Sequence, residues 1–161
     1  MSYERGERRV MAGDQSGRRP PETRARYRHF LVMPTRWMDN DVYGHVNNVV
    51  YYSFFDTAVN GLLMDAGVLD VHQGEVIGLV VETQCNYFAP IAFPQAVAAG
   101  VRVAQLGRSS VRYEIGLFAN DDDSAAAQGH FVHVYVDRAA NRPVPIPDGV
   151  RRALAGLMRP E

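Results

Sequence analysis

The longest regular pattern of apolar residues in the chain predicts a helix over residues 48–66. Apolar side chains recur there every three or four residues over about five turns, which is the period of one helix face. The members of this face are Tyr51, Phe54, Phe55, Ala58, Val59, Leu62, Leu63 and Ala66. Further apolar residues fall elsewhere on the circumference, at Val49, Val50 and Tyr52. We therefore expect a helix that is buried on most sides, capped by Asn47 or Asn48 and followed by Gly67.

Period-two alternation, or a run rich in β-branched residues, predicts strands in five other segments. The first, residues 28–36, contains Pro34, which has no backbone donor and therefore suggests a sheet edge or a strand end. The four later segments span residues 76–87, 97–105, 111–117 and 131–136. In the last of them, the alternation predicts a buried face made by Val132, Val134 and Val136.

The order of these elements predicts a single α+β domain over residues 27–161. Polar turns at residues 106–110 and 120–124 connect successive strands, and such short connections favour an antiparallel sheet. A helix that is apolar on most sides needs a sheet curled around it. A short C-terminal helix is expected over residues 147–158, with Asp148 near its start. The sequence contains no visible repeat and no second domain.

The first 26 residues have the composition of a disordered tail. They carry seven arginines against four acidic residues, together with a Pro20–Pro21 pair and few large apolar side chains. Such a segment cannot bury enough surface to offset the entropy of ordering it. A polybasic contact site is the alternative interpretation. The segment lacks the apolar stretch of a signal peptide, and its four acids argue against an Arg-rich transit peptide.

Composition excludes several function classes. The formal net charge of −1 gives no overall attraction to nucleic acid or to an anionic membrane. Cys85 is the only cysteine, so an internal disulfide and a cysteine-based metal cluster are excluded, and a reducing cytoplasmic setting is expected. No apolar run approaches the roughly 18 to 20 residues that a membrane span requires.

The candidate chemistry lies between the first strand and the long helix. Asp41, the glycine of a tight loop and the start of the helix at Asn48 fall within eight residues of one another. A helix N-terminus offers unpaired backbone N–H groups and a partial positive charge. This combination suits a developing oxyanion beside a carboxylate base or nucleophile. The alternative is that Asp41 only shapes the turn, as many aspartates before helices do.

The segment Asp39–Asp56 has the pattern DxDxxGHVNNxxYxxxFD. This pattern closely resembles the signature of the 4-hydroxybenzoyl-CoA thioesterase-like family of acyl-CoA thioesterases, which have the hotdog fold. Weaker similarities occur at Glu82–Pro90, at Gly107–Ser110 and at Arg142–Pro147, so the resemblance covers residues 28–158. It implies a five-stranded antiparallel sheet wrapped around one long central helix, and hydrolysis of an acyl-CoA thioester to the free acid and CoA.

The resemblance also implies roles for individual residues. The second aspartate of the DxD pair is Asp41, which would act as nucleophile or as general base. The backbone N–H of Asn48 would polarise the thioester carbonyl. A related hotdog branch uses a helix carboxylate instead, which makes Asp56 the rival candidate. His45 would either hydrogen-bond near the carbonyl or Asp41, or brace the loop, and Asp39 is expected to order the loop with Arg36.

Substrate recognition follows from the chemistry of CoA. A thiolate is a good leaving group, since a thiol has a pKa of about 8.5, so no strong general acid, metal or separate cofactor is expected. The phosphates of CoA call for an arginine at the pocket mouth, for which Arg108 with Ser109 and Ser110 is the candidate, unless these residues form an ordinary solvated turn. Tyr43 would line the acyl pocket or pack in the core.

The expected partners are an acyl-CoA substrate and further copies of the chain. A five-stranded sheet around one helix leaves open edges, so a homodimer or a dimer of dimers is expected, with each site completed by two subunits. Two other functions use the same scaffold. One is an acyl-thioester dehydratase or hydratase, and the other is a non-catalytic acyl-CoA-binding protein.

Overall fold

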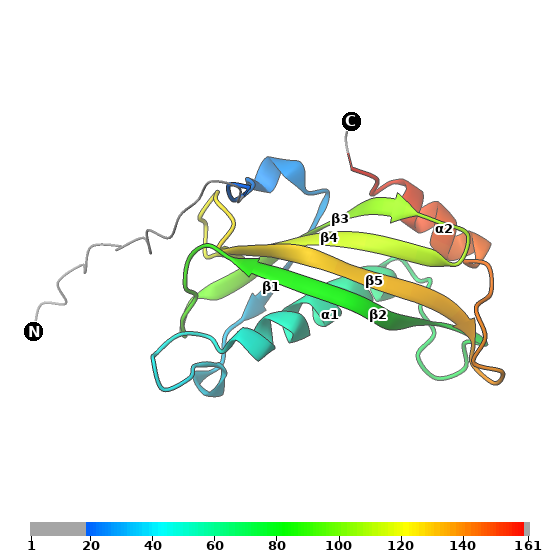
Figure 1. The fold of residues 1–161 in the computed structure, drawn as a ribbon, viewed down its shortest axis with the longest axis horizontal. Helices are drawn as coiled ribbons and strands as arrows, with labels where there is room; N and C mark the ends of the chain where they lie inside the picture. Colours follow the sequence, from blue (N-terminus) through cyan, green and yellow to red (C-terminus); the bar gives the residue numbers. More distant parts are fainter. Residues whose placement is uncertain (1–18, 160–161) are drawn as a thin grey trace, which may run out of the picture.

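The computed structural model describes residues 19–159 and consists of one sheet with one long and one short helix (Figure 1). Two single-turn 3-10 helices, η1 and η2, flank the first strand. In chain order the elements are η1 Arg24–Arg26, β1 His29–Pro34, η2 Trp37–Asp39, α1 Asn48–Asp65, β2 Val76–Tyr87, β3 Ala96–Leu106, β4 Ser110–Ala119, β5 Ala127–Asp137 and α2 Asp148–Ala155.

The five strands form one antiparallel sheet in the order β1-β3-β4-β5-β2. β1 and β2 are therefore its edges, and Pro34 ends an edge strand as predicted. α1 packs across one face of this sheet, with contacts to β1, β3 and β2. The predicted α+β class and hotdog fold, a five-stranded antiparallel sheet around one central helix, are confirmed.

α1 begins and ends where its caps predict. The side-chain Oδ1 of Asn47 accepts the backbone N–H of Val49 at 3.1 Å, and Gly67 has a φ of +68° just beyond the C-terminus. The predicted face is buried against the sheet, from Tyr51 to Leu63. The expectation of burial on most sides is wrong for the single chain, because the opposite face exposes Val49, Asp56 and Met64.

The core lies between α1 and the central strands. The alternating residues of β3 and β4 that were expected to be buried are fully so: Val97, Ala99, Val101, Val103, Val111, Tyr113, Ile115 and Leu117. In β5 the predicted face was wrong. Tyr113 pairs with Phe131 in the register between β4 and β5, so Phe131, His133 and Tyr135 face the helix. Val132 and Val134 lie half-buried on the outer face of the sheet.

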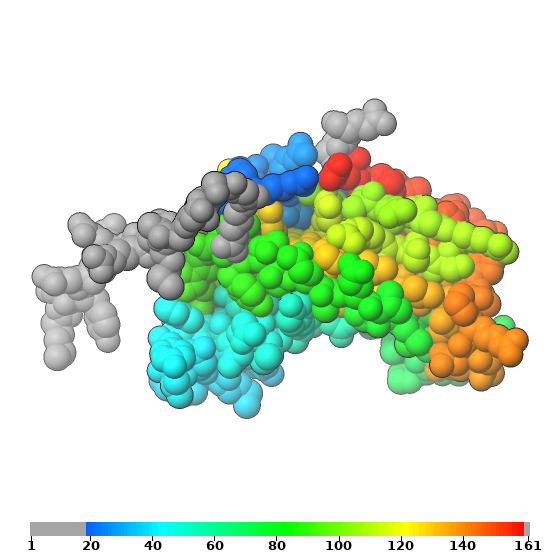
Figure 2. Space-filling view, in the orientation of Figure 1, coloured from blue at the N-terminus to red at the C-terminus, as the bar shows by residue number. Residues whose placement is uncertain are grey.

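The two long ends of the molecule carry different loops. Figure 2 shows the segment after β1, in cyan, at one end and the loop after β5, in orange, at the other.

Among the described residues, no helix has both the length and the apolar composition needed to cross a bilayer.

Residues just before β1 cover part of the outer face of the sheet. Thr23 forms a bridge with Ser124, and the Arg24 guanidinium donates to the carbonyl of Asn120 at 2.6 Å. The Tyr27 ring lies directly over Gly100 and Gly116, where an added Cβ would come within 2.8 and 2.6 Å of Tyr27 atoms. The expectation of a disordered tail is therefore wrong for residues 22–26, because their backbone and side chains bind the sheet; residues 1–18 lie outside the described part of the chain.

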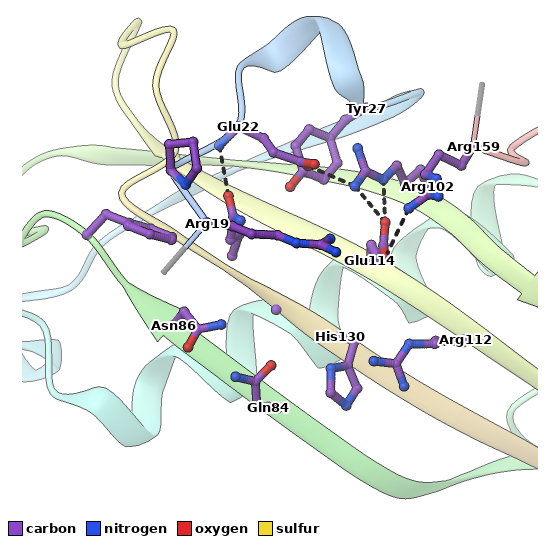
Figure 3. Close-up of a pocket in the computed structure, with 14 residues that line it drawn as sticks. Arg19, Glu22, Tyr27, Gln84, Asn86, Arg102, Arg112, Glu114, His130 and Arg159 are labelled. Atoms are coloured by element: carbon purple, nitrogen blue, oxygen red, sulfur yellow. Dashed lines mark hydrogen bonds and ion pairs between the residues drawn. The ribbon is translucent and has the colours of Figure 1, made fainter. Parts of the chain in front are cut away.

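The same segment borders a polar cleft of about 540 Å³ on the outer face (Figure 3). Gln84 and Asn86 of β2, His130 of β5 and Arg112 of β4 line one side of the cleft. Glu22 and Arg102 lie on the other side, as Figure 3 shows.

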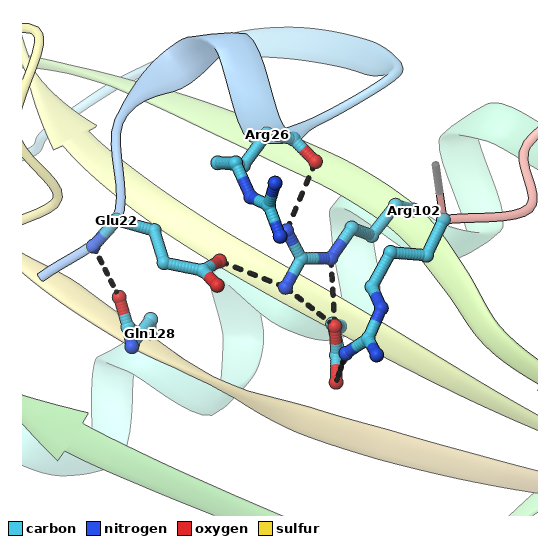
Figure 4. A network of polar contacts seen from close by, with 6 residues as sticks. Glu22, Arg26, Arg102 and Gln128 are labelled. Atoms are coloured by element: carbon cyan, nitrogen blue, oxygen red, sulfur yellow. Dashed lines mark hydrogen bonds and ion pairs between the residues drawn. The ribbon is translucent and has the colours of Figure 1, made fainter. Parts of the chain in front are cut away.

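Arg102 is the buried charge that holds this segment in place (Figure 4). Its side chain is 3% exposed, and its guanidinium contacts the carboxylates of Glu22 at 2.8 Å and Glu114 at 2.6 Å. It also donates to the carbonyl of Arg26 at 2.9 Å and lies over the Tyr27 ring at 4.8 Å. A buried charge that loses its partners is strongly destabilising, so the ordered segment is part of the domain.

We predict that a chain starting at residue 27 is less stable than one starting at residue 19. Removing residues 19–26 takes away the Glu22 and Arg26 partners of Arg102, which should cost about 2 kcal/mol or more. That cost corresponds to a fall in melting temperature of roughly 5 °C for a chain of this size, measurable by calorimetry. Equal melting temperatures for the two truncations would show that the segment contributes nothing. Glu22→Gln in the full chain tests the ion pair alone.

A second prediction concerns the stability of the protein in mild acid. His133 is 2% exposed, and burial lowers its pKa from 6.5 to about 4. Between these values the unfolded chain binds a proton that the folded chain excludes, so stability should fall as the pH drops from about 6.5 toward 4. At pH 5 the loss relative to neutral pH should be about 2 kcal/mol from this group. Urea unfolding of the wild type and of His133→Phe should show a flatter dependence for the variant; parallel curves would contradict the assignment.

Candidate active site

The loop between β1 and α1 contains a tight turn with Asp41 at its beginning. The Asp41 N–H donates to the His45 carbonyl at 2.8 Å, and the Gly44 N–H donates to the Asp41 carbonyl at 3.1 Å. Gly44 has a φ of +79°, a conformation that favours glycine over any residue with a side chain. Asn40 and Val46 pair as an antiparallel bridge around the turn. The sequence pattern therefore encodes a miniature hairpin that leads into the helix.

Asp39 fixes the base of this loop. Its side chain is 2% exposed and accepts the Arg36 backbone N–H at 2.7 Å and two guanidinium N–H groups at 3.0 and 2.8 Å. Burial raises the pKa of Asp39, but the hydrogen bonds and charge of Arg36 outweigh burial and hold it below its usual range. The Asp39 carbonyl also accepts the Asn47 N–H at 2.8 Å. Asp39 thus ties the end of β1 to the start of α1, the ordering role expected for it with Arg36.

The loop is anchored to the connection between β2 and β3. The N–H of Val46, which is buried, donates to the Ile91 carbonyl at 2.7 Å. The Phe93 N–H donates to the side-chain oxygen of Asn40 at 3.0 Å. Since Ile91 is completely buried in the core, the position of the turn is set by the body of the domain.

Asp41 presents a half-exposed carboxylate at the turn. One carboxylate oxygen accepts the Tyr43 N–H at 2.8 Å, which orients the group. Its second oxygen accepts no hydrogen bond from the residues that the structure describes. The geometry therefore leaves one oxygen free to act on a water molecule or on a substrate.

Asn48 is the first residue of α1 and is exposed. Its backbone N–H finds no acceptor within the described part of the chain, whereas its carbonyl accepts the Tyr87 hydroxyl at 3.3 Å. The first turn of α1 contains no acidic residue that would cancel the positive end of the helix dipole. An N–H that is unpaired, exposed and at the positive end of a helix is suited to bind a carbonyl oxygen or an anion.

The other candidate residues of this stretch are His45, Tyr43 and Asp56, and all three are exposed. His45 and Tyr43 are exposed, and across residues 19–159 the His45 imidazole makes neither a hydrogen bond nor an ion pair. The loop contact of His45 is made by its backbone carbonyl. Asp56 lies on the exposed face of α1, about 12 Å along the helix from Asn48 by helix rise, and accepts a hydrogen bond from Asn60 at 3.0 Å. Asp56 is therefore not part of the loop that holds Asp41.

The structure does not bring Arg108, Ser109 and Ser110 to Asp41 within one chain. Their turn joins β3 to β4 at the end of the sheet opposite to the Asp41 loop, because β1 pairs with the other end of β3, Pro34 facing Ala96. The Ser109 carbonyl accepts the Tyr135 N–H, and the Arg108 carbonyl accepts the N–H of Ile146 and a guanidinium N–H of Arg151. The carbonyls thus have structural roles, while the Arg108 side chain is exposed.

Sequence reasoning missed a collar of exposed apolar side chains around the Asp41 loop. Trp37 and Phe93 meet edge to face at 5.8 Å between ring centroids, yet Trp37 remains 82% exposed. The other members are Met38, Val42, Tyr43 and Val49. Exposed apolar patches of this kind mark binding surfaces. The available signal was the Trp37–Met38 pair directly before a polar motif.

The remaining titratable side chains of the described residues form no cluster of metal ligands. In residues 19–159, no group of three or more His, Cys, Asp or Glu side chains is arranged to hold a metal ion. Cys85 is half-buried, and burial raises the pKa of its thiol to about 11, which keeps it protonated at neutral pH.

The chain matches the family model of the thioesterase-like superfamily over residues 35–154. No curated protein sequence matches it significantly. Among solved structures, the PA5185 protein of Pseudomonas aeruginosa is 57% identical, with a TM-score of 0.85 over 87% of this chain and 98% of that one.

Two further structures carry names that describe an activity. A thioesterase from Thermus thermophilus, solved with coenzyme A and zinc, is 32% identical, with a TM-score of 0.67 over 81% of this chain and 95% of that one. A 1,4-dihydroxy-2-naphthoyl-CoA thioesterase from Synechocystis is 16% identical, with a TM-score of 0.73 over 81% of this chain and 98% of that one, and shows likeness of fold alone.

Proposed function

This chain belongs to the thioesterase-like superfamily and is a thioester hydrolase, and on that premise we propose that it cleaves acyl-CoA thioesters at the Asp41 loop. The observation that carries the proposal is a carboxylate with one free oxygen, held rigidly in a turn that leads directly into a helix whose first N–H is unpaired. The coenzyme A bound to the Thermus thermophilus thioesterase supports a CoA thioester as the substrate.

In the proposed mechanism the thioester carbonyl accepts the Asn48 N–H at the positive end of α1. That contact strengthens as negative charge develops on the carbonyl oxygen, so it stabilises the transition state more than the bound substrate. Asp41 then either attacks the carbonyl carbon, giving a mixed anhydride that water hydrolyses, or removes a proton from the attacking water. CoA departs as a thiolate, which needs no strong acid, and no cofactor enters beyond the CoA of the substrate.

Exposed residues of the same loop complete this scheme. His45 is placed one residue after the glycine of the turn, with an imidazole free to meet the substrate carbonyl or the attacking water. Tyr43 contributes an exposed ring beside Asp41, suited to the acyl group. In a single chain this loop opens to solvent with its apolar collar uncovered, and a site of this kind needs a second surface to exclude water.

We propose that the second surface is another copy of the chain, joined through β2. This strand has 12 residues, lies at the edge of the sheet, and exposes Leu79, Val80 and Val81 along its middle. An edge strand of this length, paired on one side only and apolar at its centre, is a strong template for pairing with another strand. Two-fold antiparallel pairing of β2 with its copy extends two five-stranded sheets into one and gives a homodimer.

The same pairing would assemble the site from two subunits. Tyr87, at one end of β2, contacts Asn48, and antiparallel pairing places this end beside the Val76 end of the partner strand. The Arg108 turn lies toward the Val76 end of the sheet, since Ser110 pairs with Val134, which pairs with Leu79. Arg108, Ser109 and Ser110 of the partner subunit would then lie on the same side as Asp41, where they could bind CoA phosphates.

We expect Asp41→Asn to lose at least about 10²-fold in the rate of acyl-CoA hydrolysis, because the amide can act neither as nucleophile nor as base. The measurement is thiol release from a panel of short-chain, long-chain and aromatic acyl-CoAs, with the melting temperature as a check on folding. Asp56→Asn is the matched control and should remain active.

Near-wild-type turnover by Asp41→Asn would remove Asp41 from the mechanism, and an inactive Asp56→Asn would assign the chemistry to the helix carboxylate. The same assay separates the alternatives: a dehydratase or hydratase changes the acyl group without releasing thiol, and a non-catalytic binder leaves the thioester intact.

Val81→Lys should convert the dimer into monomers and abolish activity, because a charge at the centre of β2 opposes its own copy across the two-fold axis. Val32→Lys is the matched control, since Val32 is an exposed valine of the other edge strand, β1. Sedimentation velocity at micromolar concentration should show a dimer for the wild type and the control. A fully active monomer would exclude both the β2 interface and the shared site.

A further inference from the structure

A second cavity, of about 510 Å³, lies beyond the C-terminal half of α1 on the helix side of the sheet. Its walls are mainly apolar and include Leu63, Val68, Val76 and Val150. It borders the β2 edge through residues 76–78 and the exposed face of α1 through Met64. The cavity therefore adjoins the surface that the proposed dimer would cover.

Two polar side chains of β5, His133 and Tyr135, line this apolar space. They are 2% and 4% exposed, and their rings meet edge to face with 6.3 Å between centroids. The Nδ1 atom of His133 makes no hydrogen bond with any residue that the structure describes, and the Tyr135 hydroxyl has only the neighbouring Tyr113 hydroxyl as a partner. Buried polar atoms normally have partners, and each one without a partner calls for a reason.

Gly78 explains how the imidazole is accommodated at the edge of the sheet. A Cβ at this position would lie 3.0 Å from Nδ1 of His133, so the missing side chain leaves the ring room beside the free edge of β2. Burial lowers the pKa of His133 to about 4, so at neutral pH the ring is uncharged and offers one donor and one acceptor. Together with the Tyr135 hydroxyl, it forms a small polar spot on the sheet side of the cavity, whose other polar lining residues are Asn60, Asp70 and Arg138.

The cavity is too far from Asn48 of its own chain to serve the same site. Asn60, which also lines it, lies 12 residues further along α1, or about 18 Å by helix rise. Antiparallel pairing of β2 with its copy reverses this relation, because it brings the Tyr87 end of one strand beside the Val76 end of the other. The cavity of one subunit then lies next to the helix N-terminus of its partner.

We propose that this cavity holds the acyl group of the thioester cleaved by the partner subunit, and that His133 and Tyr135 select acyl groups carrying a hydroxyl or carbonyl substituent. The inference rests on the proposed function and on the β2 dimer. The apolar walls bind the carbon skeleton, while the substituent supplies the hydrogen bond that His133 lacks and a second partner for the Tyr135 hydroxyl. A site with buried polar groups discriminates strongly against a substrate that leaves them unpaired.

The test compares matched pairs of substrates that differ only by a hydroxyl: 4-hydroxybenzoyl-CoA against benzoyl-CoA, and 6-hydroxyhexanoyl-CoA against hexanoyl-CoA. For the wild type we expect kcat/KM to be at least about 10-fold higher for the hydroxylated member of one pair or both. His133→Phe and Tyr135→Phe should lower kcat/KM for the hydroxylated member about 10-fold while changing the other member less than about twofold. His133→Phe should melt at or above the wild-type temperature, because it removes a buried polar atom without a partner. Tyr135→Phe takes the Tyr135 hydroxyl away from Tyr113 and should lower the melting temperature by no more than about 5 °C.

His130→Phe is the matched control, since His130 lies on the same strand but on the opposite face, in the outer cleft. It should leave the preference unchanged. A wild type that hydrolyses both members of each pair equally, or whose preference survives in both phenylalanine variants, would overturn the assignment and indicate that water satisfies these groups. Failure to release thiol from any of the four substrates, while other acyl-CoAs are cleaved, would also overturn it. Release from no acyl-CoA at all would instead contradict the proposed function.

Discussion

Burial of one apolar face of α1 is the constraint on which the rest of the structure depends. Seven side chains of this helix are buried, and each of the larger ones contributes on the order of 2 kcal/mol when it leaves water. One five-stranded sheet covers this face and leaves the opposite face exposed. The helix N-terminus therefore emerges at one end of the sheet with Asn48 exposed, while the other end leaves a cavity beside the β2 edge.

The Asp41 loop uses this arrangement by being rigid without being buried. Asp39, through Arg36 and Asn47, joins the end of β1 to the start of α1, and Val46 joins the turn to the buried Ile91. These contacts hold the backbone of the turn, so the carboxylate of Asp41 can stay half-exposed with one oxygen unpaired. Positioning by the backbone is what allows a short, open loop to carry a preorganised reactive group.

The sheet has two faces with different polar chemistry. On the outer face Arg102 is buried and fully engaged by Glu22, Glu114 and the carbonyl of Arg26, so its charge stabilises the docking of the N-terminal segment. On the helix face His133 and Tyr135 are buried; among the described residues Nδ1 of His133 has no hydrogen-bond partner, and the Tyr135 hydroxyl has only that of Tyr113. The contrast separates a polar cluster that serves the fold from the one that we propose contacts the acyl group.

The sequence alone determined the features that depend on short-range chemistry. The 3.6-residue period and its caps located α1 from Asn48 onward, alternation located the strands, and the motif around Asp41 placed a carboxylate beside a helix start. Contacts between residues far apart in the sequence decided the remaining features. The register between β4 and β5 turned Phe131 and His133 toward the helix in place of the valines. The pairing of β1 with β3, Pro34 facing Ala96, placed the Asp41 loop and the Arg108 turn at opposite ends of β3. Docking of residues 22–26 likewise required Arg102, about 80 positions away, which no local pattern could reveal. Local propensity acts over a few residues, whereas register, strand order and buried ion pairs join residues that only the folded chain brings into contact.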